Sequence, residues 1–258
     1  MQSREKNYQG YIIDLDGTMY RGADPIKEAP GFIERLRAKE VPFLFLTNNS
    51  TGHPSDKVEQ LRRVGVEAYP EEVYTSSLAT ADYLASLGGK TVYAIGEKGL
   101  LDALSEKGLI FDDQAPDYVV IGLDRQVTYE KLEKAVLLIQ AGAQFFATNK
   151  DTNIPTERGM SPSNGALVAF VEKAVDVSPK FIGKPEAIIM EKALEKLGCQ
   201  ASEVLMVGDN YETDIRSGLD NQIDTLLVLS GFTTKQDLEQ VEKQPTYVVE
   251  TLDDWEIE

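Results

Sequence analysis

Asp14 and Asp16 follow a short apolar run and are the residues of this sequence best suited to chemistry. Residues 11–14 are expected to form a buried strand. Side chains alternate along a strand, so both carboxylates are expected on the same side, where they can serve one site. Carboxylates bind hard cations such as Mg2+, and they can also attack phosphorus or transfer a proton. The alternative is an ordinary turn, because Asp-Gly pairs such as Asp16-Gly17 are common at strand ends.

A second pair of acids, Asp209 and Asp214, follows the apolar run 204–207. Asp209 could complete an octahedral Mg2+ shell, and Asp214 could bind through water or orient a lysine. The alternative is helix capping, since Asp209, Asn210 and Asp214 are of types favoured at helix N-termini.

Two further segments offer groups for a phosphate. Thr47 and Asn48 follow the apolar run 42–46, and hydroxyl, amide and backbone N–H groups can hold a phosphate without charge. The alternative is a helix-capping cluster, because Ser, Thr and Asn are favoured at helix N-termini. Lys184 precedes Pro185 at the start of a predicted helix, where its ammonium could neutralise a transferred phosphoryl group; a solvated lysine is the alternative.

Short β-branched or aromatic runs alternate with amphipathic stretches, which predicts an α/β fold with a mostly parallel sheet. Ligands of such sheets bind beyond the carboxyl ends of the strands, so the candidate residues are expected along one edge. The predicted strands are 11–14, 42–46, 91–95, 118–121, 144–147, 204–207 and 225–229. The predicted helices include 29–38, 128–140, 166–175, 186–197 and 211–217.

Composition excludes several classes of partner. The chain has 26 basic and 43 acidic residues, a net charge of −17, which repels nucleic acid and anionic membranes. A phosphate site in so acidic a protein needs local positive charge.

The single cysteine, Cys199, excludes an intrachain disulfide and a cysteine-based metal cluster. Without a signal-like segment or an apolar run of about 18 residues, a cytoplasmic location is expected.

The order of the segments resembles the haloacid dehalogenase-like hydrolase superfamily. Its four motifs match DxDGT at 14–18, TNNS at 47–50, GKP at 183–185 and GDNxxTD at 208–214. The resemblance implies a Rossmann-like parallel-sheet core formed by residues 1–76 and 180–258, with an α/β cap domain inserted at 77–179. Within the superfamily the chain is similar to the NagD-type branch, which includes para-nitrophenylphosphatase-like enzymes and acid sugar phosphatases.

The resemblance implies a Mg2+-dependent phosphomonoesterase of small phosphate esters, with sugar phosphates favoured. Asp14 would form an aspartyl-phosphate, and Asp16 would protonate the leaving group and then activate water. The resemblance also implies that Asp14, the backbone carbonyl of Asp16 and Asp209 bind the metal, with Asp214 and Asn210 in support. Thr47 and Asn48 would bind the phosphate. Lys184 would pair with Asp14 and the phosphoryl group.

The cap is expected to select the substrate. Residues 149–162 form a long polar loop in this prediction, and Asn149, Asp151 and the following Asn164 are the candidates for closing over the leaving group. A solvated loop followed by an ordinary helix cap is the alternative. The apolar face of helix 166–175 could serve the cap core or a dimer contact, and the resemblance favours a homodimer.

Two other activities fit part of the pattern. A phosphomutase or phosphotransferase would use a second acceptor in place of water. A receiver-type regulator would accept phosphate on Asp14 without hydrolysing it. Asp16 argues against the regulator, because a proton shuttle beside the nucleophile would shorten the life of a phospho-signal; the inserted cap argues for an enclosed substrate.

Overall fold

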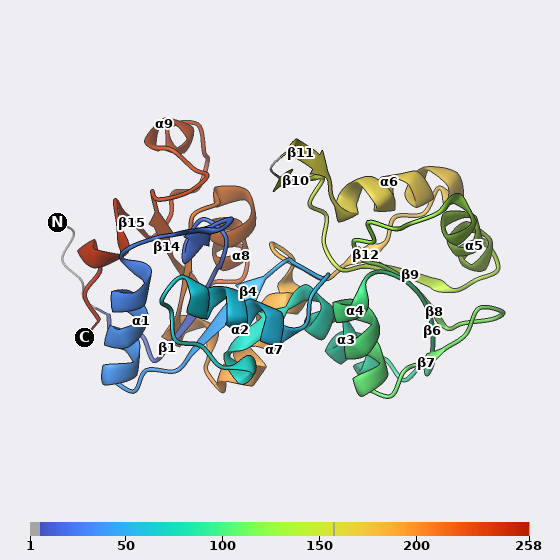
Figure 1. Cartoon of the computed structure of the whole chain (residues 1–258), viewed down its shortest axis with the longest axis horizontal. Helices are drawn as coiled ribbons and strands as arrows, with labels where there is room; N and C mark the ends of the chain where they lie inside the picture. The colour runs from blue at the N-terminus through green and yellow to red at the C-terminus, as the bar shows by residue number, and fades with distance from the viewer. Residues whose placement is uncertain (1–5, 157, 258) are drawn as a thin grey trace. The chain divides into compact units, whose positions relative to one another are not determined.

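The computed structural model describes residues 6–156 and 158–257, and the chain divides into two compact units. Unit 1 comprises Met1–Thr47, Ser55–Tyr74 and Met190–Glu258, and unit 2 comprises Asn48–Pro54 and Thr75–Ile189. Each unit contains its own sheet with helices (Figure 1), which confirms the predicted α/β class. Unit 2 also takes in residues 48–54 and 180–189, so the predicted boundaries of a cap at 77 and 179 stay a prediction.

The sheet of unit 1 has the predicted DxDGT strand at its centre. Strand β1 pairs in parallel with β13 on one side and β4 on the other. The strands in sheet order are β15 (Tyr247–Val249), β14 (Asp224–Val228), β13 (Val204–Gly208), β1 (Gly10–Ile13), β4 (Phe43–Thr47) and β5 (Val73–Thr75). A small hairpin, β2 (Tyr20–Arg21) and β3 (Asp24–Pro25), follows β1.

The apolar face of β1 builds the main core of unit 1. Tyr11 and Ile13 pack in one cluster with Phe32 and Leu36 of α1, and the C-terminal Trp255 joins them. The Trp255 indole N–H donates to the Tyr11 hydroxyl at 3.2 Å. Burying such a side chain stabilises the fold by roughly 1.5–3 kcal/mol. The α-helices that lie wholly or mostly in unit 1 are α1 (Ala29–Ala38), α2 (Pro54–Arg63), α7 (Ala187–Leu197), α8 (Arg216–Leu219) and α9 (Lys235–Leu238).

Unit 2 is built around a second parallel sheet. Its strands in order are β12 (Lys180–Phe181), β9 (Gln144–Ala147), β8 (Tyr118–Ile121), β6 (Thr91–Ile95) and β7 (Ile110–Phe111). Its helices are α3 (Ser76–Ser86), α4 (Lys98–Glu106), α5 (Tyr129–Gln140) and α6 (Asn164–Val175). Val168 and Val171 of α6 pack in the core of this unit, whereas Phe170 is largely exposed.

Two predicted elements differ from the structure. The predicted loop 149–162 contains an antiparallel hairpin, β10 (Asn153–Thr156) and β11 (Gly159–Pro162); residue 157 lies outside the described residues. The polar residue types of this segment did not indicate a strand pairing, because that pairing depends on backbone hydrogen bonds. The predicted helix 211–217 is a π-helical turn, η3 (Tyr211–Ile215), followed by α8. Shorter helical turns are η1 (Pro70–Glu72), η2 (Ala201–Glu203) and η4 (Leu252–Asp254).

Over the described ranges, the model contains no helix with both the length and the apolar character required to cross a membrane.

Candidate active site

The carboxyl ends of three neighbouring strands place the candidate residues of unit 1 side by side. Ile13 of β1 is in register with Val207 of β13 and with Phe45 of β4. Asp14 directly follows β1, Asp209 directly follows β13, and Thr47 ends β4. The parallel register therefore brings groups that are 33 to 195 residues apart in the chain to one edge of the sheet, as the sequence predicts.

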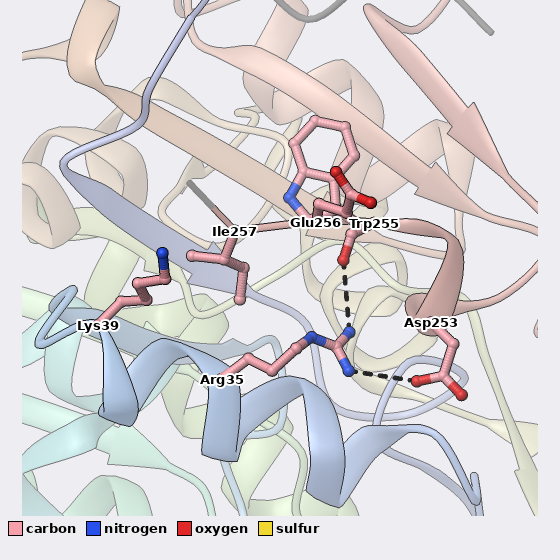
Figure 2. Close-up of a pocket in the computed structure, with 6 residues that line it drawn as sticks. All are labelled: Arg35, Lys39, Asp253, Trp255, Glu256 and Ile257. Atoms are coloured by element: carbon pink, nitrogen blue, oxygen red, sulfur yellow. Dashed lines mark hydrogen bonds and ion pairs between the residues drawn. The ribbon is translucent and has the colours of Figure 1, made fainter.

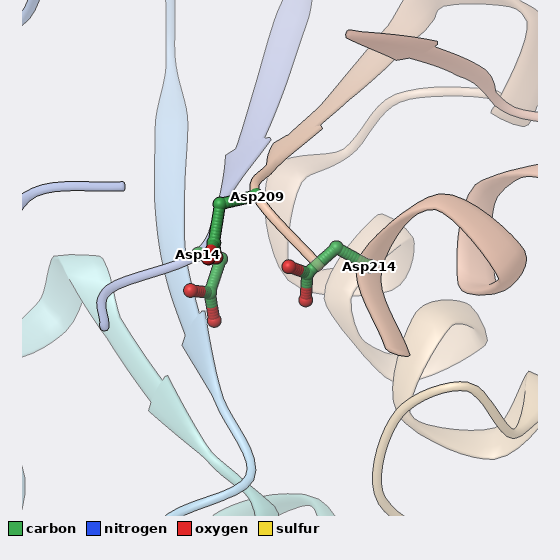
Figure 3. A group of neighbouring side chains, drawn as sticks. All are labelled: Asp14, Asp209 and Asp214. Atoms are coloured by element: carbon green, nitrogen blue, oxygen red, sulfur yellow. The ribbon is translucent and has the colours of Figure 1, made fainter. Parts of the chain in front are cut away.

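Asp14, Asp209 and Asp214 form a cluster of buried carboxylates (Figure 3). Each offers an oxygen atom, and these atoms lie within 4.8 Å of one another. The side chains are 8%, 3% and 1% exposed, respectively. Three like charges so close together and so poorly solvated repel one another, and a divalent cation would offset that repulsion. The oxygen donors and their spacing fit a hard cation that binds partly through water.

Glycines make the close approach of these carboxylates possible. A Cβ atom built on Gly17 would lie 2.1 Å from Asp209 Oδ2, and one on Gly208 would lie 2.3 Å from Asp214 Cβ. Gly17 also has a φ of +98°, a conformation that side chains disfavour. Both positions therefore require glycine for the cluster to keep its geometry.

Asp16 differs from Asp14 in its exposure to solvent. β1 ends at Ile13, and Asp16 is exposed whereas Asp14 is buried. That both carboxylates serve one site, as the strand alternation implies, stays a prediction. The Gly22 N–H donates to Asp16 Oδ1 at 3.4 Å, so the carboxylate is attached to the β2–β3 hairpin.

The buried phenol of Tyr20, in β2, is influenced by the charges of both acids. Burial raises the pKa of the Tyr20 phenol above its ordinary value of 10, and the negative charges of Asp16 and Asp14 raise it further. The phenol therefore stays protonated at physiological pH.

Asp214 and Asn210 hold the start of η3. The Asn210 backbone N–H donates to Asp214 Oδ2 at 3.0 Å, and the Asn210 side-chain oxygen accepts from the Glu212 N–H at 3.0 Å. Asn210 is therefore a helix cap, as the capping alternative expected. It supports the acid cluster by placing Asp214, and no metal contact is needed to explain its residue type.

Asn48 is extensively bonded within unit 2. Its side-chain nitrogen lies 3.1 Å from both carboxylate oxygens of Asp151 and 3.0 Å from the Lys184 carbonyl oxygen. Its own carbonyl accepts from the Ser76 hydroxyl at 2.7 Å. An amide has two N–H groups, and these contacts engage both. The structure thus favours a positioning role for this side chain, and phosphate binding by Thr47 and Asn48 stays a prediction.

Lys184 is 2% exposed, in contrast to the solvated lysine considered as an alternative. A buried ammonium requires compensating negative or polar groups, so burial supports a functional or structural charge here. Just before Lys184, the Gly183 N–H donates to the Thr148 carbonyl at 2.8 Å. Lys184 belongs to unit 2 and Asp14 to unit 1, so their pairing stays a prediction.

The predicted substrate-facing residues separate into two kinds. Asn149 and Asn164 are buried, and the Asn164 amide nitrogen lies within 3.2 Å of oxygens of Ile121, Thr148 and Asn149. Asp151 is only partly buried. The two asparagines therefore hold strand ends of unit 2 together, and substrate contact by all three stays a prediction.

An open hollow of about 550 Å³ lies away from the acid cluster, at the C-terminal segment of unit 1 (Figure 2). It is lined by Arg35, Lys39, Asp253, Trp255, Glu256 and Ile257. The Arg35 guanidinium donates to the Leu252 carbonyl at 2.8 Å and pairs with Asp253 at 3.3 Å. These contacts attach the chain terminus to α1, so the hollow carries no candidate catalytic group.

Comparison with known proteins identifies the family. A family model described as haloacid dehalogenase-like hydrolase matches residues 11–110, and a second, described as HAD-hydrolase-like, matches residues 181–255. An acid sugar phosphatase from Staphylococcus aureus (strain USA300) is 51% identical over 251 residues, which are 96% of this chain and 97% of that protein. The chain belongs to the haloacid dehalogenase-like hydrolase family. Enzymes of this family generally use Mg2+, and the carboxylate cluster could bind such an ion.

Solved structures place the chain in the NagD-type branch of haloacid dehalogenase-like hydrolases. A thermostable NPPase double mutant from Geobacillus stearothermophilus is similar with a TM-score of 0.93 and 48% identity, covering 98% of this chain and 99% of that one. NagD from Escherichia coli K-12 is similar with a TM-score of 0.93 and 32% identity, covering 97% and 99%. The predicted family, its NagD-type branch and the phosphatase class are confirmed, so these relatives argue against the receiver-type regulator.

Sequence reasoning missed one group of residues beside the cluster. The Phe232 N–H donates to Asp209 Oδ2 at 2.6 Å, and Gly231 lies against the same carboxylate. The available signal was the position of Ser230-Gly231 just beyond the predicted strand 225–229, where ligand-binding loops of parallel sheets occur.

Proposed function

We propose that this chain is a Mg2+-dependent phosphomonoesterase that hydrolyses small phosphate esters, with sugar phosphates as its substrate class, through an aspartyl-phosphate. The observation that supports it best is the buried cluster of Asp14, Asp209 and Asp214 at the carboxyl end of a parallel sheet. The printed name of the Staphylococcus aureus relative, an acid sugar phosphatase, favours the sugar phosphates.

In this proposal Asp14 is the nucleophile. One carboxylate oxygen of Asp14 attacks phosphorus while the bond from phosphorus to the ester oxygen breaks. The Asp16 carboxyl donates its proton to the departing oxygen. Asp16 then accepts a proton from water as that water attacks phosphorus, and cleavage of the acyl–phosphate bond returns Asp14 and releases inorganic phosphate. Acid–base catalysis of this kind contributes about 10²- to 10⁴-fold.

The other predicted residues would stabilise charge. Asp14, Asp209 and the backbone carbonyl of Asp16 would hold Mg2+, with Asp214 in support, and the ion when bound supplies positive charge for the phosphoryl group. Thr47 and Asn48 would bind phosphate oxygens, and Lys184 would neutralise the transferred group. Positioning and charge stabilisation supply most of the catalysis of phosphoryl transfer, so removing any of these groups should lower turnover.

The test is phosphate release from para-nitrophenyl phosphate and a panel of sugar, nucleotide and cofactor phosphates. Wild type should release phosphate with Mg2+ and lose this activity in EDTA. Asp14→Asn should abolish turnover because the neutral amide cannot act as the nucleophile. Circular dichroism of Asp14→Asn checks that the fold is intact.

Four results would contradict all or part of the proposal. Turnover by Asp14→Asn at the wild-type rate would exclude the nucleophile, and full activity in EDTA would exclude the metal. A panel in which sugar phosphates are the poorest substrates would exclude the substrate class while leaving the phosphatase class intact. Transfer of the phosphoryl group to a second sugar without free phosphate would indicate the phosphomutase alternative.

The remaining predictions concern partners and location. A small phosphorylated metabolite is the expected partner, with no nucleic acid and no membrane partner, since a net charge of −17 disfavours both. The homodimer and the cytoplasmic location stay predictions. Sedimentation equilibrium at micromolar concentration decides between monomer and dimer.

A further inference from the structure

Residues 230–233 follow β14 and contact each element that carries one of the clustered carboxylates. We call them the 230–233 segment. Its strongest contact is with Asp209: the Phe232 N–H donates to Asp209 Oδ2 at 2.6 Å, and the Thr233 N–H donates to the Asp209 carbonyl at 3.0 Å. Two successive backbone N–H groups thus hold both the side chain and the main chain of Asp209.

Gly231 sets the space available to the same carboxylate. A Cβ atom on Gly231 would lie 1.9 Å from Asp209 Oδ2 and 2.4 Å from its Cγ, far inside contact distance. Gly17 approaches the same oxygen from the turn after β1. The Asp209 carboxylate is therefore flanked by two glycines, and a side chain at either position would displace it.

The segment also contacts the elements that carry Asp14 and Asp214. The Ser230 hydroxyl donates to the Gly17 carbonyl at 2.9 Å, in the turn that follows Asp14. The Thr233 hydroxyl accepts from the Tyr211 N–H at 2.8 Å, at the first residue of η3, which carries Asp214. Thr233 is buried, so this bond is shielded from water.

We propose that the 230–233 segment positions the three carboxylates and thereby sets the affinity of the site for a divalent cation. This inference rests on the Mg2+ site of the proposed function. The segment contacts the acids and their backbones, so Ser230, Gly231 and Thr233 are positioning residues. Partners that orient metal ligands typically change metal affinity or activity by about 10- to 100-fold when mutated.

Gly231→Ala is the sharpest variant, because Gly231 has no left-handed φ and the added methyl acts through space alone. Thr233→Val removes the hydroxyl that accepts from Tyr211 at nearly constant volume. Isothermal titration of each metal-free protein with MgCl2 should show about 10- to 100-fold weaker binding in both variants. Saturating Mg2+ should restore most of the turnover, which a general loss of structure would not allow.

Two controls separate positioning from folding. Gly31→Ala, where the nearest atom lies 3.7 Å from the added Cβ, should keep wild-type affinity. Thr233→Ser keeps the hydroxyl and should restore binding relative to Thr233→Val. If Gly231→Ala does not fold, Thr233→Val carries the test.

Wild-type Mg2+ affinity in folded Gly231→Ala or Thr233→Val would overturn this inference and leave the proposed metal site intact. Failure of the wild type itself to bind Mg2+ would contradict the proposed metal site, and this inference with it. The two failures are therefore distinguishable in one titration series.

Discussion

Asn164 is fully buried, and its side-chain nitrogen lies within hydrogen-bond distance of the Ile121 carbonyl, the Thr148 hydroxyl and the Asn149 carbonyl. These acceptors lie at the ends of β8 and β9, so one amide holds the start of α6 against two strands. The sequence suggested a substrate contact here, because an asparagine before a helix and after a polar segment is equally compatible with either role.

Asn164→Ala should lower the free energy of unfolding, because it leaves buried acceptors without their donor. A cost of about 1–3 kcal/mol is expected from the unsatisfied groups. Relative kcat/KM across the phosphate panel should stay constant. Urea denaturation measures the first effect, and Asn153→Ala, at an exposed site of the neighbouring hairpin, is the matched control. A changed substrate ranking with unchanged stability would instead support the substrate-contact prediction for Asn164.

At the scale of elements, Glu97 and Arg125 join two neighbouring strands of unit 2. Glu97 follows β6 and Arg125 follows β8, and these strands pair in parallel. Glu97 Oε1 accepts from Arg125 Nε at 2.7 Å, and Oε2 accepts from its Nη2 at 2.7 Å. The hydrogen bonds from Arg125 lower the pKa of Glu97 below its ordinary value of 4.5.

The stabilisation from Glu97 should depend on pH in a defined direction. Because its folded-state pKa is lowered, the stabilisation is present above about pH 4.5 and is lost as pH falls through the lower folded-state value. Glu97→Gln should therefore lower the free energy of unfolding by less than about 1 kcal/mol at pH 7, since Arg125 is largely exposed. In strong acid the substitution should leave the free energy of unfolding unchanged. Urea denaturation from pH 7 downward measures the difference.

Glu59→Gln is the matched control for this pair. Glu59 pairs with Arg63 on the surface of α2, with both side chains largely exposed. Its substitution should change stability little at any pH. An equal effect of the two substitutions, or a Glu97 effect that grows toward acid, would contradict the bidentate pair as the cause.

For the whole molecule, the dominant feature is negative charge. The net charge of −17 opposes compaction, and the cluster of Asp14, Asp209 and Asp214 adds three carboxylates in a buried place. Monovalent salt screens the surface part of this repulsion. A bound divalent cation would act specifically on the buried part, because it binds only the folded arrangement.

MgCl2 should raise the unfolding temperature more than NaCl at equal ionic strength. When Mg2+ is present at 100 times its dissociation constant, the expected stabilisation is about 2.7 kcal/mol. Differential scanning calorimetry with EDTA, NaCl and MgCl2 measures it. Asp209→Asn should lose the Mg2+-specific increment and keep the NaCl increment. Identical responses of wild type to the two salts would exclude a specific cation site that stabilises the fold.

The α/β class, the strand that leads to Asp14 and the family follow from the sequence alone. The apolar runs are local patterns, and the acids come directly after them, so their place at strand ends needs no knowledge of the fold. The four motifs in order then identify the family, as the relative at 51% identity confirms. Lys184 could also be chosen as a candidate site residue from the sequence, because it directly precedes a predicted helix.

Only the tertiary structure could show which groups touch. The parallel register of β1 with β13 brings Asp14 beside Asp209, and the turn after Ile13 leaves Asp16 exposed despite its parity with Asp14. Ser230 lies more than 200 residues from Asp14 in the chain, yet its hydroxyl donates to the Gly17 carbonyl, three residues after Asp14, at 2.9 Å. Such contacts are set by packing between distant segments, and no local pattern of residue types encodes them.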